Sequence, residues 1–207
     1  MRTQIRIVAG SLRGRKITCE VNPDLRPTPQ RAREAMFNIL GDAIPGRDFY
    51  DVFAGTGVVG IEALSRGATN ASFVERDFRL IEGLERVFKE FKLRNARILR
   101  ADVYRWVERW QPPAAPVNVF LSPPFPDLQR REDEMIASLS TLQQRLAPGS
   151  VLILQGEKAA MLDRLPLREE WDERKYGRNH LLFWVKPMPA EPAQEPEAGN
   201  AAQAIAP

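Results

Sequence analysis

The chain has 207 residues, of which 43% are hydrophobic, and this is enough for one folded domain with a sizeable core. Its one cysteine, Cys19, excludes an intrachain disulfide and favours a reducing compartment such as the cytoplasm. No stretch approaches the roughly 18 apolar residues of a membrane span, and the first residues hold no long apolar run, so we expect neither a membrane segment nor a signal peptide.

Charge is distributed unevenly, although the net charge is only +3. Residues 1–40 carry eight Arg or Lys against three Asp or Glu, whereas residues 188–207 carry three Glu and no basic residue. The basic start either favours a polyanionic partner or forms a solvated basic face. The stretch 187–207 is rich in Pro, Ala and Glu and has little to bury, so we expect a disordered tail there.

The first predicted elements form a small N-terminal extension over residues 1–25. Two short strands, over 4–10 and 15–21, flank a turn that contains Gly14. A helix follows, for which Thr28 is a suitable N-cap with Pro29 at the first helical position. Helical spacing gives this helix one apolar face, made of Ala32, Ala35, Met36, Ile39 and Leu40.

Strands and helices alternate from residue 48 onwards. The strands are predicted over 49–53, 71–75, 96–100, 117–121 and 150–155, and a hairpin over 168–186 closes the folded part. This alternation predicts an α/β domain over 26–186, with a mostly parallel sheet and helices on both faces. Ligands bind at the carboxyl ends of such strands, so the loops after residues 53, 75, 101 and 121 are expected on one rim.

The loop after the first of these strands reads DVFAGTGVVG, residues 51–60. Its glycines let the backbone turn sharply and approach a ligand closely. GTGVVG also fits the G-x-G-x-x-G pattern of dinucleotide-binding folds, and Glu75 follows Gly55 by twenty residues, where an acid can hold a ribose diol. The loop predicts a nucleotide-type site or else a tight strand–helix turn.

Two acids favour S-adenosylmethionine over a nicotinamide cofactor. Asp51 lies at a strand end just before the loop, where its carboxylate suits a ligand with an ammonium group and would repel a pyrophosphate. Asp102 follows the third strand, where an acceptor can meet an adenine amine. An Asp after a strand is also a common helix N-cap.

The fourth loop is SPPF, residues 122–125, after an apolar strand. An exocyclic amine on a base is a poor nucleophile, because its lone pair is delocalised into the ring. Ser122 Oγ and a carbonyl of Pro123–Pro124 can hold its N–H groups, and the prolines stiffen the loop and add no competing N–H. Phe125 can stack on the base, a contact worth about 1–3 kcal/mol. The loop therefore predicts methyl transfer to the exocyclic amine of a flat base, with catalysis mainly through positioning of that amine. The alternative is an apolar turn that packs on the core.

The motifs together resemble the bacterial enzymes that methylate N2 of one guanine in 16S ribosomal RNA, the guanine-966 N2-methyltransferases. The matching stretches are RIVAGSLRGRKI, RPTPQRAREAMFNIL, DVFAGTGVVGIEALSRGA, FVERD, SPPF and YGRNHLLFW, in this order over residues 5–186. The resemblance implies a seven-stranded Rossmann-like class I methyltransferase sheet with a small N-terminal hairpin. It also implies 16S rRNA as the partner, within the small ribosomal subunit or an assembly intermediate.

The resemblance assigns roles to named residues. S-adenosylmethionine, with S-adenosylhomocysteine as product, is assigned to Asp51, Phe53, Ala54, Gly55, Thr56, Gly57, Glu75, Arg76, Asp102 and Val103. The target base is assigned to Ser122, Pro123, Pro124 and Phe125. Basic residues near the start are expected to bind RNA phosphates beside the pocket, about half of them being structural instead: Arg13, Arg15, Lys16, Arg26, Arg31 and Arg33.

One residue departs from the family pattern, because Ser122 stands where the family usually has Asp. A hydroxyl holds an amine less strongly than a charged acceptor does, so we expect a slower guanine-N2 enzyme.

Ser122 is also the only feature that favours a DNA cytosine-N4 methyltransferase. A dehydrogenase and a non-catalytic RNA-binding or assembly factor that keeps the cofactor pocket are further alternatives. No metal-ligand cluster is visible in the sequence, and we expect a monomer.

Overall fold

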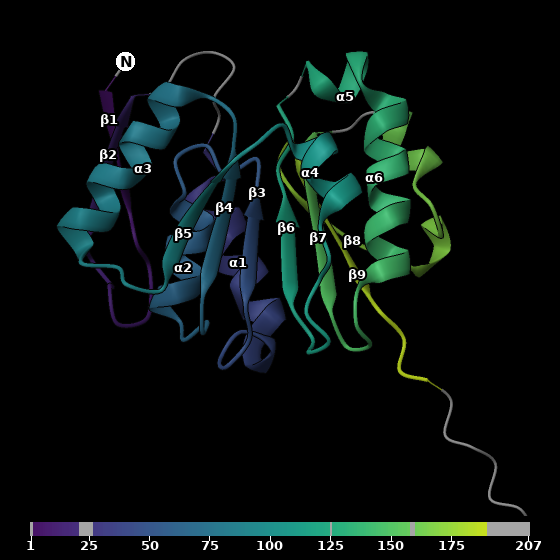
Figure 1. The fold of residues 1–207 in the computed structure, drawn as a ribbon, viewed down its shortest axis with the longest axis horizontal. Coiled ribbons are helices and arrows are strands. Elements are labelled where there is room, and N and C mark those ends of the chain that lie inside the picture. Colours follow the sequence, from purple (N-terminus) through teal and green to yellow (C-terminus); the bar gives the residue numbers. More distant parts are fainter. Residues whose placement is uncertain (1, 21–26, 125, 158–159, 190–207) are drawn as a thin grey trace, which may run out of the picture.

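The structure is a computed structural model that describes residues 2–20, 27–124, 126–157 and 160–189. A seven-stranded sheet with the order β5-β4-β3-β6-β7-β9-β8 crosses it, and a separate hairpin, β1–β2, lies to one side (Figure 1). Strands β3 to β7 are parallel, and β9 pairs antiparallel with β7 and β8. The predicted α/β fold is confirmed, together with the seven strands and the hairpin that the resemblance implies.

The predicted elements appear with small shifts at their ends, except that the first strand, predicted over 4–10, spans Arg2–Arg6 and ends four residues earlier. The strands are β1 Arg2–Arg6, β2 Lys16–Glu20, β3 Phe49–Val52, β4 Ala71–Glu75, β5 Ala96–Arg100, β6 Asn118–Leu121, β7 Val151–Glu157, β8 Asp172–Tyr176 and β9 Asn179–Val185. The helices are α1 Gln30–Leu40, α2 Val58–Ser65, α3 Phe78–Phe91, α4 Val103–Arg109, α5 Asp127–Arg130 and α6 Glu132–Arg145, with 3₁₀ turns Gly41–Ala43, Ala160–Arg164 and Arg168–Glu170. None of the helices in these ranges combines the length and the apolar character that crossing a bilayer requires.

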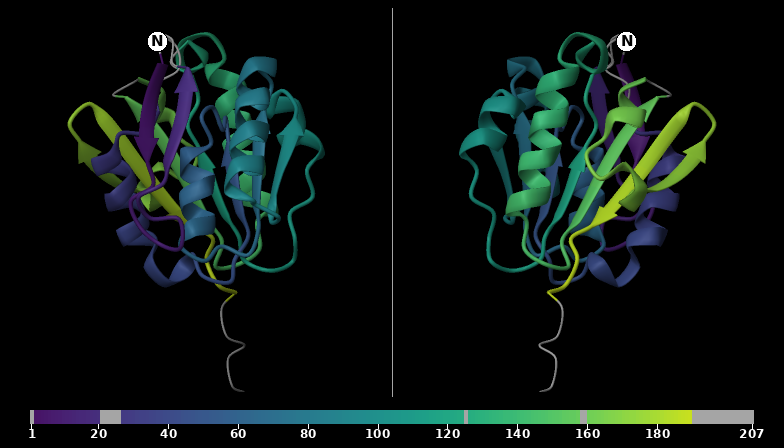
Figure 2. Two further views of the ribbon diagram at one scale, coloured as in Figure 1. Left: turned by 90° about the vertical axis from the view of Figure 1, so that its left-hand side faces the viewer. Right: turned by 90° about the vertical axis from the view of Figure 1, so that its right-hand side faces the viewer.

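Helices cover both faces of the sheet, as Figure 2 shows from its two sides. Helices α1, α2 and α3 and the β1–β2 hairpin share one buried cluster with one face, and α4, α5 and α6 share a second cluster with the other face. Neighbouring residues of β3 serve opposite clusters, because successive side chains of a strand point to opposite faces: Phe49 belongs to the first and Tyr50 to the second.

Two aspartates start helices directly after strands. The side chain of Asp77 accepts hydrogen bonds from the N–H groups of Arg79 and Leu80 at the start of α3. Asp102 accepts in the same way from Tyr104 and Arg105 at the start of α4. These caps satisfy N–H groups that have no partner within the helix, and they keep both strand-to-helix loops short at the carboxyl edge of the sheet.

The predicted cap of α1 is wrong. The helix begins at Gln30 with Pro29 at the N-cap position, and no side chain caps it. Thr28 instead donates its hydroxyl hydrogen to Oε1 of Gln155 on β7, at 2.7 Å. A buried acceptor far along the sequence competes with the local cap and holds the residue before the helix against the sheet.

The domain boundaries at residues 25 and 186 stay predictions. Residues 190–207 lie outside the described residues, so the disorder predicted for the tail also stays a prediction.

A buried ion pair joins α1, α2 and the hairpin. Arg33 is fully buried, and its Nε donates to Glu62 Oε2 at 2.6 Å. Its remaining nitrogens donate to the backbone carbonyls of Thr28, at 3.0 Å, and Arg6, at 2.7 Å. Arg66 donates to the other oxygen of Glu62 at 2.9 Å. The pair thereby fixes three separate segments relative to one another.

Arg33→Met should destabilise the protein strongly. It leaves Glu62 buried with only Arg66 as a charged partner, and breaking a buried pair from one side costs about 3–5 kcal/mol, so we expect a loss of about 3 kcal/mol in the free energy of unfolding. Urea unfolding measures this loss. Arg31→Met, on the exposed side of the same helix, is the matched control and should change stability by less than about 0.5 kcal/mol. Equal effects of the two substitutions would contradict the role of the pair.

Candidate functional site

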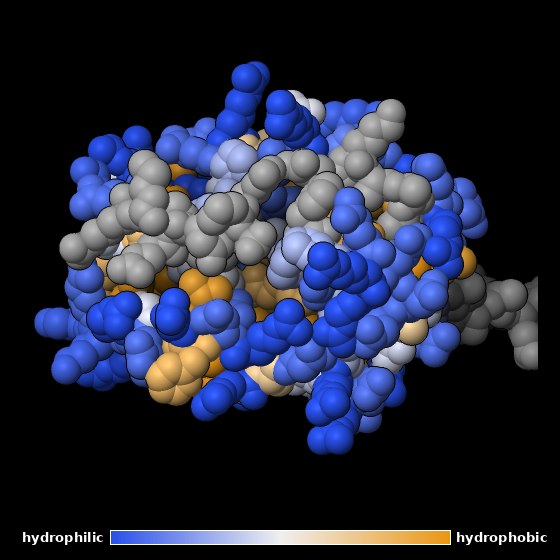
Figure 3. Space-filling view, turned by 90° about the horizontal axis from the view of Figure 1, so that it is seen from above, coloured by the Kyte–Doolittle hydropathy of each residue, from blue (hydrophilic) through white to orange (hydrophobic). Residues whose placement is uncertain are grey.

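A cavity of about 880 Å³ opens at the carboxyl ends of the parallel strands. The loops that follow β3, β4, β5 and β6 line it, together with residues 27–29 before α1 and the turn between β8 and β9. Figure 3 looks onto this end of the molecule, where hydrophobic side chains show among hydrophilic ones. The cavity confirms that the four predicted loops meet at one rim, as the parallel topology requires.

Most of the residues predicted for the cofactor line this cavity. They are Asp51, Phe53, Ala54, Gly55, Thr56, Glu75, Arg76, Asp102 and Val103. Gly57 is not among the lining residues. Its φ of +71° and its closeness to Leu84, whose Cδ2 lies 2.2 Å from where a Cβ would stand, give it the sharp turn into α2 instead.

Asp51 is the most buried acid of the cavity, with 1% of its surface exposed. Its Oδ2 accepts from the N–H of Gly60 at 2.8 Å. Burial raises its pKa to about 7, and the charge of Glu75 adds to this rise, whereas the hydrogen bond from Gly60 opposes it. A cationic ligand group beside Asp51 would favour the ionised carboxylate, so this end of the cavity is built for positive charge.

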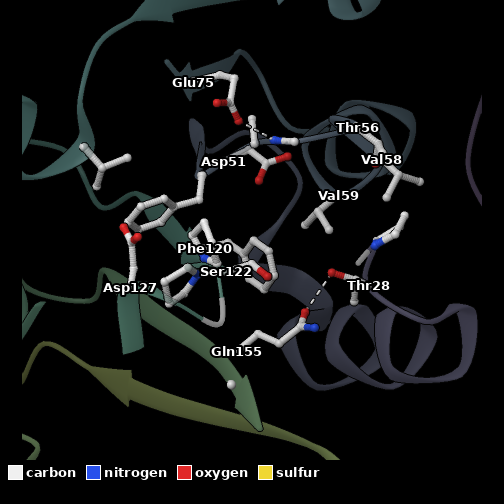
Figure 4. A pocket seen from close by; sticks show the side chains of 18 of the residues that line it. Thr28, Asp51, Thr56, Val58, Val59, Glu75, Phe120, Ser122, Asp127 and Gln155 are labelled. Atoms are coloured by element: carbon white, nitrogen blue, oxygen red, sulfur yellow. Dashed lines mark hydrogen bonds between the residues drawn. The ribbon is translucent and has the colours of Figure 1, made fainter. Parts of the chain in front are cut away.

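Glu75 holds the glycine loop in place. Its Oε2 accepts from the N–H of Gly55 at 2.9 Å, and its Oε1 accepts from the N–H groups of Arg76 and Asp77. Figure 4 shows Glu75 and Asp51 near each other on one side of the cavity. Since a carboxylate oxygen can accept two hydrogen bonds, Oε2 keeps capacity for a ligand hydroxyl.

Asp102 acts as a cap and as an ion-pair partner. Its Oδ1 caps α4, and its Oδ2 accepts from Arg76 at 3.1 Å and from Arg131 at 2.9 Å. Burial tends to raise the pKa of Asp102, but the hydrogen bonds from Arg131, the Arg105 N–H and Arg76 outweigh it and hold this pKa below its ordinary value. All acceptor sites of this carboxylate are therefore used, and an adenine amine would have to displace an arginine.

The predicted base loop lies between the end of the cavity that holds Asp51 and the end that holds Gln155 (Figure 4). Ser122, Pro123 and Pro124 line the cavity, and Phe125 lies outside the described residues. The Ser122 N–H donates to the carbonyl of Val52, which ties the loop to β3. The Pro124 carbonyl accepts from the N–H groups of Asp127 and Leu128, so it is already used in the start of α5.

Several polar residues of the cavity were not predicted. Thr28, Gln155 and Asn179 lie on the side away from Asp51, and the buried Asp127 accepts from the Tyr104 hydroxyl at 3.1 Å. Gln155 ends the apolar strand predicted over 150–155, so the rule that placed four loops on the rim also identifies its position. The turn between β8 and β9 gives no such signal, because the rule that ligands bind at the carboxyl ends of parallel strands does not apply to the turn of an antiparallel hairpin.

The predicted RNA-binding arginines separate into different environments. Arg33 is wrong as an RNA contact, because it is fully buried against Glu62. Arg26 lies outside the described residues. Arg31 is exposed in the first turn of α1, next to residues 27–29 of the cavity wall.

Arg13 and Arg15 belong to the turn of the N-terminal hairpin, Lys16 begins β2 directly after it, and none of the three lines the cavity. This turn packs on the last residue of α2, where Ser65 accepts from the N–H of Ser11. Arg15 donates to the carbonyl of Glu90, near the end of α3. Both helices begin at the cavity and end near the hairpin turn, so these three residues lie at the far end of the helices from the cavity and not beside it as predicted.

Across the described part of the chain, no three His, Cys, Asp or Glu side chains gather as a metal site.

The chain is similar to known proteins over most of its folded part. A family model described as "Conserved hypothetical protein 95" matches residues 5–185. "Ribosomal RNA small subunit methyltransferase D" of Escherichia coli is 39% identical over 123 residues, which are 59% of this chain and 61% of that protein, so the chain spans less than two thirds of this relative. The protein of the same name from Haemophilus influenzae is 32% identical over 75% of this chain and 80% of its own length.

A solved structure has the same fold along its whole length. The Escherichia coli "Putative methyltransferase yhhF" superposes with a TM-score of 0.74 at 30% identity, over 89% of this chain and 99% of the other.

Asp51→Asn should change the pH dependence of stability. Because the folded pKa of Asp51 is raised to about 7 from 3.8, its contribution to stability is fully present below pH 3.8 and is lost as the pH rises through 7. The asparagine variant should therefore gain stability relative to the wild type between about pH 5 and pH 8. Urea unfolding of both proteins across this range measures the difference, and a difference that does not vary with pH would contradict the assignment.

Proposed function

We propose that this chain, which belongs to the Conserved hypothetical protein 95 family, is an S-adenosylmethionine-dependent methyltransferase that acts on the exocyclic N2 amine of a guanine in 16S ribosomal RNA. The observation that carries the proposal is one cavity that holds both Asp51 with the glycine loop and Ser122 with its two prolines. The names of the two relatives support ribosomal RNA of the small subunit as the substrate. The resemblance of the motifs supports guanine N2.

The residues present fit the cofactor. S-adenosylmethionine supplies a methyl group bonded to a sulfonium and also carries an ammonium group, and the buried carboxylate of Asp51 suits this positive charge. Glu75 fixes the Gly55 N–H and keeps an acceptor for a ribose hydroxyl. Phe53, with a φ of +63°, starts the loop in a conformation that few residues adopt, and this strain supports a ligand-binding role.

The base loop contributes by positioning the acceptor amine. Ser122 Oγ and the Pro123 carbonyl are the acceptors we assign to the two N–H groups of the guanine amine, because the Pro124 carbonyl already takes part in the start of α5. Held in this way, the amine directs its lone pair at the methyl group. This orientation would supply most of the rate. With S-adenosylmethionine bound, formation of the N–C bond would break the bond from the methyl carbon to sulfur, the electron pair would stay on sulfur, and the amine would release its proton to solvent.

The experiment that tests the function is transfer of a labelled methyl group. Unmodified small ribosomal subunits, naked 16S RNA and duplex DNA are offered side by side, and the labelled base is mapped. We expect N2-methylguanine at one site of the ribosomal RNA, in the subunit or its assembly intermediate rather than in naked RNA, with the enzyme acting as a monomer. Label in DNA cytosine, or cofactor binding with no transfer to any of the three, would overturn the proposal.

Ser122→Asp should raise the single-turnover rate of methylation. A charged acceptor holds an N–H group about twice as strongly as a neutral one, which corresponds to roughly five- to tenfold in rate. Ser122→Ala removes the acceptor and should lower the rate. An unchanged or lower rate for the aspartate variant would show that the hydroxyl is not the limiting contact.

Arg178→Ala should weaken RNA binding and flatten its salt dependence. Arg178 is exposed at the cavity mouth, in the turn between β8 and β9, where it can meet a phosphate of the target nucleotide. Losing one phosphate contact reduces the slope of log K against log salt by about 0.7–0.9. Arg94→Ala, an exposed arginine between α3 and β5, is the control and should leave the slope unchanged. Equal slopes for both variants and the wild type would contradict this contact.

A further inference from the structure

The cavity has two chemically different ends. Asp51, Glu75 and Asp102 supply carboxylates at one end, whereas Thr28, Gln155 and Asn179 supply hydroxyl and amide groups at the other. Figure 4 shows Ser122 and Phe120 between Asp51 on one side and the Thr28–Gln155 pair on the other. A volume of about 880 Å³ lies in the upper part of the roughly 300–1,000 Å³ range of ligand pockets, which leaves room for a second flat ligand beside a cofactor.

The neutral end is a hydrogen-bonded chain of three side chains, of which Thr28 and Gln155 are buried and Asn179 is half-buried. Thr28 is 5% and Gln155 6% exposed. The Thr28 hydroxyl donates to Gln155 Oε1 at 2.7 Å, and Gln155 Nε2 donates to Asn179 Oδ1 at 3.2 Å. These two bonds orient the amide, with its oxygen toward Thr28 and its nitrogen toward Asn179. Segments from before α1, from β7 and from β9 meet in this chain, although they are distant in sequence.

The Gln155 amide keeps unused hydrogen-bonding capacity on both atoms. A carbonyl oxygen has two acceptor sites and an NH₂ group has two hydrogens, and the bonds to Thr28 and Asn179 use one of each. What remains is one acceptor site on the oxygen and one hydrogen on the nitrogen of the same amide. Guanine presents the complementary pair, because its N1–H donates and its O6 accepts on the edge that also carries the N2 amine.

We propose that Gln155 is the residue that selects the target base, accepting from N1–H and donating to O6 of a guanine whose N2 amine lies at Ser122, while Thr28 positions its amide. This inference rests on the proposed function. Enzymes that modify a base take it out of the stack and read its Watson–Crick edge in a pocket, and a site built to hydrogen-bond a substrate rejects analogues that lack the partner groups.

The test compares two acceptors that both carry the 2-amino group. Small subunits are reconstituted with 16S RNA that has either guanine or 2-aminopurine at the position methylated by the wild type. 2-Aminopurine keeps the methyl acceptor but lacks N1–H and O6. The readouts are the ratio of kcat/KM for the two substrates and the Kd of S-adenosylhomocysteine.

The wild type should prefer guanine, and Gln155→Met should reduce this preference by about tenfold or more, since two hydrogen bonds are lost. Methionine has nearly the same length and shape as glutamine. The variant should bind S-adenosylhomocysteine with a Kd within about twofold of the wild type, because Gln155 lies at the other end of the cavity. Gln144→Met, on the exposed side of α6, is the matched control and should change neither value.

Thr28→Val keeps Gln155 and removes only the hydroxyl that orients it. It should reduce the guanine preference by about threefold, and it serves as the second variant if the methionine protein does not fold. The inference would be overturned if the wild type methylated both bases equally, or if the preference survived in the Gln155 and Thr28 variants. Neither result would contradict the proposed function, because guanine would still be methylated. A wild type that methylates no guanine overturns the proposed function itself.

Discussion

The buried pair of Arg33 and Glu62 is the constraint on which the site depends. Glu62 lies in α2, the helix that starts at the glycine loop, and Arg33 lies in α1, whose preceding residues form the opposite wall of the cavity. Arg33 also binds the carbonyl of Thr28. The two walls are therefore tied through one guanidinium. A buried pair of this kind is weak evidence for stability, because its desolvation is costly. The guanidinium of Arg33 nevertheless donates three hydrogen bonds to three different segments, and these fix geometry in a way that an apolar contact cannot.

The same pair explains why a small hairpin accompanies the sheet. Arg33 donates to the carbonyl of Arg6, and the hairpin turn packs on Ser65 at the far end of α2. Gly10 allows this approach, because a Cβ there would stand 1.7 Å from the Ser65 carbonyl oxygen. The N-terminal strands thus brace α2 at both its middle and its end. These contacts hold α2 in place, and with it the glycine loop at the start of this helix.

The sequence allowed the sheet and half of the cavity to be predicted. Apolar strands with helices between them, and acids at strand ends, are local patterns, so Asp51, Glu75 and Ser122 could be placed on one rim. The roles of Thr28 and Arg33 could not, because their partners, Gln155 and Glu62, are distant in sequence and a local cap or a surface charge explains each residue equally well. The arginines of the N-terminal hairpin were predicted beside the pocket, but they lie away from it. The direction in which the hairpin strands run relative to the sheet is a tertiary property that local sequence patterns do not reveal.

Charge within the cavity restricts which part of an RNA can enter it. Five carboxylates line the cavity, those of Asp51, Glu75, Asp77, Asp102 and Asp127, and three of them are almost fully buried. Asp51, Glu75 and Asp102 lie together at one end, so a phosphate that approached them would be repelled across a short distance in a poorly screened environment. The other end offers neutral hydroxyl and amide groups that suit a base edge, and the exposed Arg178 stands at the mouth. Backbone outside and base inside is the arrangement that this distribution favours. A nucleotide extruded from the RNA would fit this arrangement, because its base can pass Ser122 while its phosphate stays beside Arg178. In the proposed reaction, the acids that suit a cationic cofactor would therefore also keep the RNA backbone at the rim, so one distribution of charge would determine where each ligand binds.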